Sequence, residues 1–154
     1  MGQSLVLAGR VDSGTGARHA RNLGYGAEMP NKDLDVARLR RTNLLLVGTE
    51  LMVSNLICSL WSNFVEPIVV RRRDERLRLA PSSEPIGTMI LYGVDTLTDD
   101  EQRALQDWLT VRNGRTRVVS TVSASLLPMV EACAFSDSVY YRLNTVCIDL
   151  TSQC

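Results

Sequence analysis

The most informative segment of this 154-residue chain for its fold is Asn43-Leu44-Leu45-Leu46-Val47-Gly48. A continuous apolar run closed by a glycine is typical of a strand that is buried on both faces of a parallel sheet. Residues 51–63 then carry apolar side chains at the spacing of a helix. A buried strand followed directly by a helix begins a strand–helix–strand unit, so the stretch predicts an α/β domain.

The same alternation continues along the chain. Further strands are predicted at 67–70, 88–94, 116–122 and 146–150, and further helices at 98–113, 124–132 and 135–143. The helix after Thr98 has the clearest signals, because Thr98-Asp99-Asp100-Glu101 is a capping box and Asn113-Gly114 ends it. Residues 77–79 could add an edge strand. We therefore expect residues 31–154 to form a three-layer α/β domain with a mainly parallel sheet and helices on both faces.

Residues 1–30 differ from the rest, since they hold Gly2, Gly9, Gly14, Gly16, Gly24 and Gly26 and little hydrophobic periodicity. They predict a flexible Gly-rich arm, to which residues 5–8 could contribute a short edge strand. Ser13-Gly14-Thr15-Gly16-Ala17 echoes a phosphate-binding loop, but Ala17 stands where that loop needs a lysine. We interpret the segment as part of the arm. A short helix is predicted at 33–41, acidic at its start and basic at its end.

The charge balance of the chain bears on whether it binds nucleic acid. Lys and Arg total 17 against 17 Asp and Glu, and Lys32 is the sole lysine. A net charge of zero argues against a nucleic-acid-binding surface, because phosphate affinity depends on concentrated positive charge. No apolar run approaches the roughly 20 residues that span a bilayer. We expect a cytoplasmic protein with no direct nucleic-acid or membrane partner.

Several residue types carry no catalytic or metal-binding pattern. The cysteines form no Cys-x-x-Cys pair and, in apolar stretches such as those around Cys58, Cys133 and Cys147, are interpreted as reduced thiols acting as small hydrophobic residues. The lone His19 has no patterned ligand beside it, so no metal site is expected. The run of arginines at 71–73, followed by Asp74 and Glu75, predicts a solvated loop or a partner-facing edge. No catalytic residue is assigned.

Two segments carry a resemblance to a known family: Gly87-Thr88, at the start of the strand predicted at 88–94, and Tyr140-Tyr141-Arg142-Leu143-Asn144. With the order of elements over about residues 43–150, they resemble the AAA+ ATPase domain of sigma-54-dependent transcriptional activators of the NtrC type. That family reads Phe-Arg-x-Asp-Leu-Tyr-Tyr-Arg-Leu-Asn at the second segment, which Phe135, Asp137 and residues 140–144 match. The resemblance implies a P-loop NTPase-like fold.

The resemblance also shows where this chain departs from the family. Against the family's Gly-Glu-Ser-Gly-Thr-Gly-Lys-Glu loop it offers Gly48-Thr49-Glu50-Leu51-Met52-Val53-Ser54-Asn55, with bulky side chains where phosphates would lie and Ser54 at the lysine position. Tyr92 and Gly93 replace the Walker B Asp and Glu, and a register slip to Asp95 is unfavourable. Ser123 replaces the sensor Asn. These positions define a vestigial nucleotide site: Gly48, Thr49, Glu50, Ser54, Asn55, Tyr92, Gly93 and Ser123.

The family's arginine-finger segment is also altered, because Ser136 stands at the first arginine and Arg142 at the second. The resemblance further implies that the sigma-contacting insertion and the C-terminal helical lid are missing. We expect a non-catalytic pseudo-ATPase without cofactor, a regulatory or scaffold protein that binds itself or a related AAA+ ATPase.

The alternative is a weak ATP-binding protein or ATPase in transcription regulation, which would hold ATP and Mg²⁺ through residues 48–55 or the glycines at 14–16. A divergent domain without a retained role is a third possibility.

Overall fold

The computed structural model describes residue 35 and residues 42–153. The arm expected at 1–30, its strand at 5–8 and, apart from residue 35, the helix expected at 33–41 lie outside the described residues.

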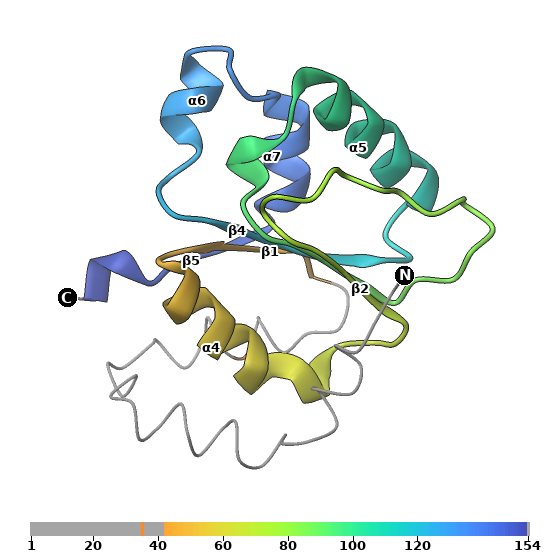
Figure 1. Ribbon diagram of the computed structural model, residues 1–154, viewed down its shortest axis with the longest axis horizontal. Helices are drawn as coiled ribbons and strands as arrows, with labels where there is room; N and C mark the ends of the chain where they lie inside the picture. Colours follow the sequence, from red (N-terminus) through yellow and green to blue (C-terminus); the bar gives the residue numbers. More distant parts are fainter. Residues whose placement is uncertain (1–34, 36–41, 154) are drawn as a thin grey trace.

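Five strands form one sheet in which every pairing is parallel, in the order β2-β3-β4-β1-β5 (Figure 1). The described helices and strands are β1 (Leu44–Val47), α4 (Glu50–Leu60), η1 (Trp61–Asn63), β2 (Ile68–Arg71), β3 (Thr88–Leu91), η2 (Val94–Thr96), α5 (Asp99–Arg112), β4 (Arg117–Val122), α6 (Leu127–Glu131), α7 (Asp137–Leu143), β5 (Val146–Asp149) and η3 (Thr151–Gln153). The predicted three-layer α/β fold is confirmed, and this sheet is wholly parallel.

Strand β1 explains why its sequence is apolar without alternation. Leu44 and Leu46 belong to the core under α4, whereas Leu45 and Val47 belong to the core under α5 and α7. Figure 1 shows α4 on one face of the sheet and α5, α6 and α7 on the other. Burial of each such side chain contributes about 1.5–3 kcal/mol, so both faces of β1 stabilise the fold.

Helix α5 fixes the long connection between β2 and β3. The predicted capping box at Thr98 and Glu101 is present. The Glu101 carboxylate also accepts a hydrogen bond from the Leu77 backbone N–H at 2.9 Å. Farther along, Trp108 Nε1 donates to the Ala80 carbonyl at 2.9 Å and Arg112 donates to the Pro81 carbonyl at 2.7 Å. The edge strand expected at 77–79 is therefore wrong, because this segment bonds to α5 instead of to the sheet.

Three other expectations need correction. Strand β3 ends at Leu91 because Gly93 adopts φ +65°, which leaves the extended conformation. Helix α6 is shorter than the expected 124–132 and carries Pro in its first turn. Cys58, Cys133 and Cys147 are free thiols as expected, but all are exposed, since helix surface, turn and edge strand leave them outside the core. Within the described residues, no helix is long and apolar enough to cross a membrane.

Candidate functional site

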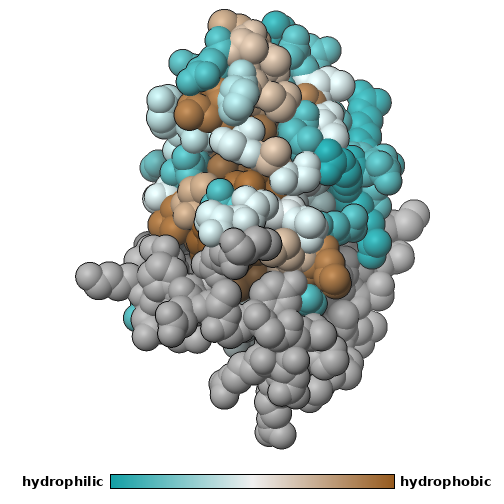
Figure 2. All heavy atoms as spheres, turned by 90° about the vertical axis from the view of Figure 1, so that its left-hand side faces the viewer, coloured by the Kyte–Doolittle hydropathy of each residue, from teal (hydrophilic) through white to brown (hydrophobic). Residues whose placement is uncertain are grey.

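Parallel strands place their carboxyl ends at one edge of the sheet, where open α/β sheets usually bind ligands. Gly48, Tyr92 and Ser123 follow β1, β3 and β4, so the topology brings these three positions to that edge. Figure 2 looks onto this edge and shows hydrophobic residues among polar ones. Leu51, at 70% exposed, and Leu127, at 44%, are among the exposed apolar side chains.

The turn after β1 is very short, because Gly48 and Thr49 are the only residues between β1 and α4. The Gly48 N–H donates to the Val122 carbonyl at 2.9 Å. Thr49 is the N-cap of α4, and its side chain accepts from the Met52 N–H at 3.3 Å. Glu50 adds a carboxylate to the first turn, where the helix dipole favours negative charge. The residues aligned with the family's phosphate loop thus form the start of a capped helix.

Apolar side chains lie against Gly48. A Cβ atom built on Gly48 would be 3.2 Å from Leu150 Cβ and 3.5 Å from Met52 Cβ. Leu150 is only 4% exposed. The three bulky residues singled out from the sequence diverge: Met52 flanks Gly48, Val53 enters the core under α4, and Leu51 lies on the surface. Leu150, which the sequence did not indicate, comes nearest to the position that a Cβ atom on Gly48 would take.

Ser54 and Tyr92 are brought together across the gap between α4 and β3. Burial raises the pKa of Tyr92, while a hydrogen bond between its hydroxyl and the Ser54 side chain opposes that rise. Ser54 aligns with the family's phosphate-loop lysine, and Tyr92 aligns with its Walker B aspartate. Asn55 follows Ser54 in α4.

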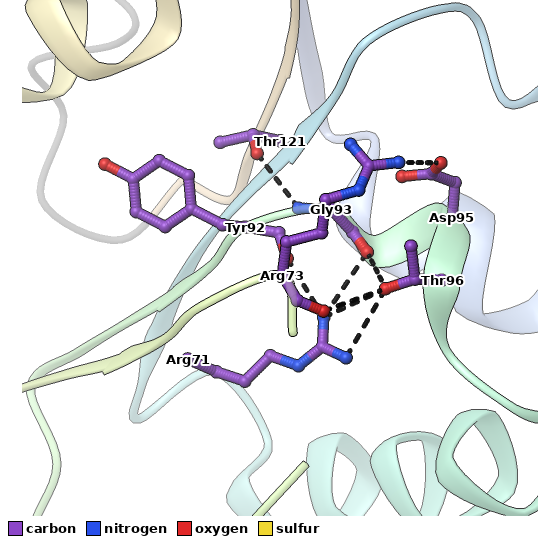
Figure 3. A network of polar contacts seen from close by, with 7 residues as sticks. All are labelled: Arg71, Arg73, Tyr92, Gly93, Asp95, Thr96 and Thr121. Carbon is purple, nitrogen blue, oxygen red and sulfur yellow. Dashed lines mark hydrogen bonds and ion pairs between the residues drawn. The ribbon is translucent and has the colours of Figure 1, made fainter. Parts of the chain in front are cut away.

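The end of β3 is held by Arg71, the last residue of β2 (Figure 3). The Arg71 side chain is 7% exposed. Its guanidinium donates to the Glu75 carbonyl at 2.8 Å, to the Tyr92 carbonyl at 2.9 Å and to the Gly93 carbonyl at 3.3 Å. The Gly93 N–H donates to Thr121 Oγ1 at 3.1 Å. The expectation of a solvated Arg71 is wrong, because its guanidinium is buried and donates hydrogen bonds to backbone carbonyls of the turns that follow β2 and β3.

Arg73 reaches the same turn from the other side. Its guanidinium lies 2.7 Å from the Asp95 carboxylate. Its aliphatic stem packs on Gly93, since a Cβ atom there would be 2.7 Å from Arg73 Cγ. Figure 3 shows the Tyr92 side chain pointing away from both arginines. The run of arginines was the one sequence signal for this network, and it could not indicate which side chain would be buried.

The arginine-finger segment lies elsewhere. Ser136 caps α7 by accepting from the Val139 N–H at 3.4 Å, and its own N–H donates to Gln102 Oε1 at 2.8 Å. Arg142, in the last turn of α7, is exposed, and its carbonyl accepts from Asn43 Nδ2 at 2.9 Å. Because Asn43 directly precedes β1, Arg142 lies near the amino edge of the sheet. The structure does not bring it together with Gly48 and Tyr92 in one chain.

The described residues contain no cluster of three or more His, Cys, Asp or Glu side chains suited to a metal ion. Beside Arg142, Tyr141 is 70% exposed and its ring meets that of Tyr140 edge to face at 5.3 Å.

Comparison with solved structures finds the same fold in NtrX from Brucella abortus. The ATP complex gives a TM-score of 0.59 at 14% identity, covering 78% of this chain and 34% of NtrX. The ADP complex gives 0.57 at 13% identity, with 78% and 35% covered. This chain thus spans about a third of the length of the NtrX chains.

A search of curated proteins finds no match. A family model described as the sigma-54 interaction domain matches residues 27–152. Since that match covers most of the chain, the protein belongs to the sigma-54 interaction domain family.

Proposed function

We propose that this protein is a non-catalytic sigma-54 interaction domain, a cytoplasmic regulatory or scaffold protein that binds itself or a related AAA+ ATPase. The observation that carries the proposal is the turn at Gly48. Two residues join β1 to α4, and Leu150 and Met52 lie against the glycine. A phosphate-binding loop wraps its ligand with several exposed backbone N–H groups and adds a lysine. This turn has neither the length nor the lysine.

The local charges and hydrogen bonds support the same proposal. The Met52 N–H is bonded to the Thr49 side chain, and the Val53 N–H is bonded to the Thr49 carbonyl at 3.0 Å. The Glu50 carboxylate in the first turn of α4 would repel a phosphate. We infer that these two N–H groups at the start of α4 are bonded within the chain and are not available to an anion.

The end of β3 argues against a Mg²⁺-assisted hydrolysis. Tyr92 and Gly93 offer no carboxylate there, and the Asp95 carboxylate is paired with Arg73. Oδ2 of Asp95 is paired with Arg73, and Oδ1 is buried without a hydrogen-bond partner among the described residues. The guanidinium 2.7 Å from this carboxylate neutralises its charge and would repel a cation placed beside it. The residues at this edge therefore fit a magnesium nucleotide poorly.

The exposed end of α7 supports a role in contact with another subunit. Arg142 and Tyr141 are exposed near the amino edge, away from the vestigial site. Asn43 fixes the Arg142 backbone through the 2.9 Å hydrogen bond, while the guanidinium is left outside the core. A cation held in this way is suited to reach a carboxylate or phosphate of a neighbouring domain.

To test this proposal, the full chain is mixed with an intact ATPase of the same family. Co-migration of the two proteins and the rate of ATP hydrolysis by the ATPase are then measured. We expect a complex and an altered rate, both lost in Arg142→Ala. Arg103→Ala is the matched control, because Arg103 is another exposed helical arginine, 79% accessible. Absence of any complex, or equal binding by Arg142→Ala and the unmodified chain, would contradict the proposed contact.

A further inference from the structure

We draw no further inference here: the strongest candidate, the open groove between residues 76–79 and the start of α5, carries nothing, because the Glu101 carboxylate within it is already bonded to the N–H groups of Leu77 and Thr98 and nothing in the structure shows what covers its apolar residues.

Discussion

The guanidinium of Arg73 lies 2.7 Å from the carboxylate of Asp95, across the turn that follows β3. This ion pair encloses Gly93, whose φ of +65° places it in the left-handed region. Gly93 aligns with the position at which the family carries a water-activating glutamate. A side chain at this position would collide with Arg73, so the turn requires a glycine here.

Replacing Gly93 by alanine should destabilise the fold more than the same change at Gly114. Both glycines have positive φ, which costs an alanine about 1–2 kcal/mol. A Cβ at Gly93 also lies 2.7 Å from Arg73 Cγ, whereas nothing lies within 4 Å of one at Gly114. Overpacking should add about 1–3 kcal/mol at Gly93 alone. Urea unfolding measures the difference, and adding Arg73→Ala should remove the extra cost. Equal losses at the two glycines would contradict this packing.

Arg71→Lys should cost about 2–3 kcal/mol of stability, because a lysine cannot replace the planar fork that serves the carbonyls of Glu75, Tyr92 and Gly93. The matched control is Arg72→Lys, since Arg72 is exposed and should change stability by less than about 0.5 kcal/mol. Thermal or urea unfolding of both variants provides the measurement. An equally small loss of stability in Arg71→Lys and Arg72→Lys would show that the hydrogen bonds of Arg71 do not stabilise the fold.

The Glu101 carboxyl should make stability depend on acid pH. Burial tends to raise the pKa of Glu101, but hydrogen bonds from the Leu77 and Thr98 N–H groups, together with the charge of Arg71, hold it below its ordinary value. The stabilisation is therefore complete above the unfolded-state pKa and is lost as pH falls through the lower folded-state value. Glu101→Gln should cost about 1 kcal/mol at neutral pH and flatten the acid slope of unfolding.

Asp100→Asn is the matched control for the substitution, because Asp100 lies in the same helical turn with its side chain 95% exposed. It should change the free energy of unfolding by less than about 0.5 kcal/mol. An acid slope that persists in Glu101→Gln would assign the pH dependence to other groups.

Local signals were sufficient to predict the positions of the five sheet strands and of α5. The apolar run of residues 44–47 and the capping box at Thr98 each depend on neighbours in sequence, and both are present. The segment at 77–79 was expected to be an edge strand, but its Leu77 N–H donates to the Glu101 carboxylate and not to a neighbouring strand. That competition depends on a contact between residues far apart in the chain, which a sequence window does not contain.

The candidate site was predictable in position but not in its contacts. Gly48 and Tyr92 follow predicted strands, so a parallel sheet places them at one edge. Nothing local indicates that Leu150, directly after β5, packs on Gly48, or that the Ser54 side chain forms a hydrogen bond with Tyr92. The burial of Arg71 was missed for the same reason, since two of its carbonyl partners, Tyr92 and Gly93, follow β3.

Calorimetric titration of the full chain with ATP or ADP in the presence of Mg²⁺ tests whether the site beside Gly48 has lost nucleotide binding. We expect no saturable heat at millimolar nucleotide, because Leu150 and Met52 lie against Gly48 and the Glu50 carboxylate repels a phosphate at the start of α4. Sub-millimolar binding that is abolished by Gly48→Ala or Ser54→Ala would contradict it and establish a nucleotide-binding protein instead.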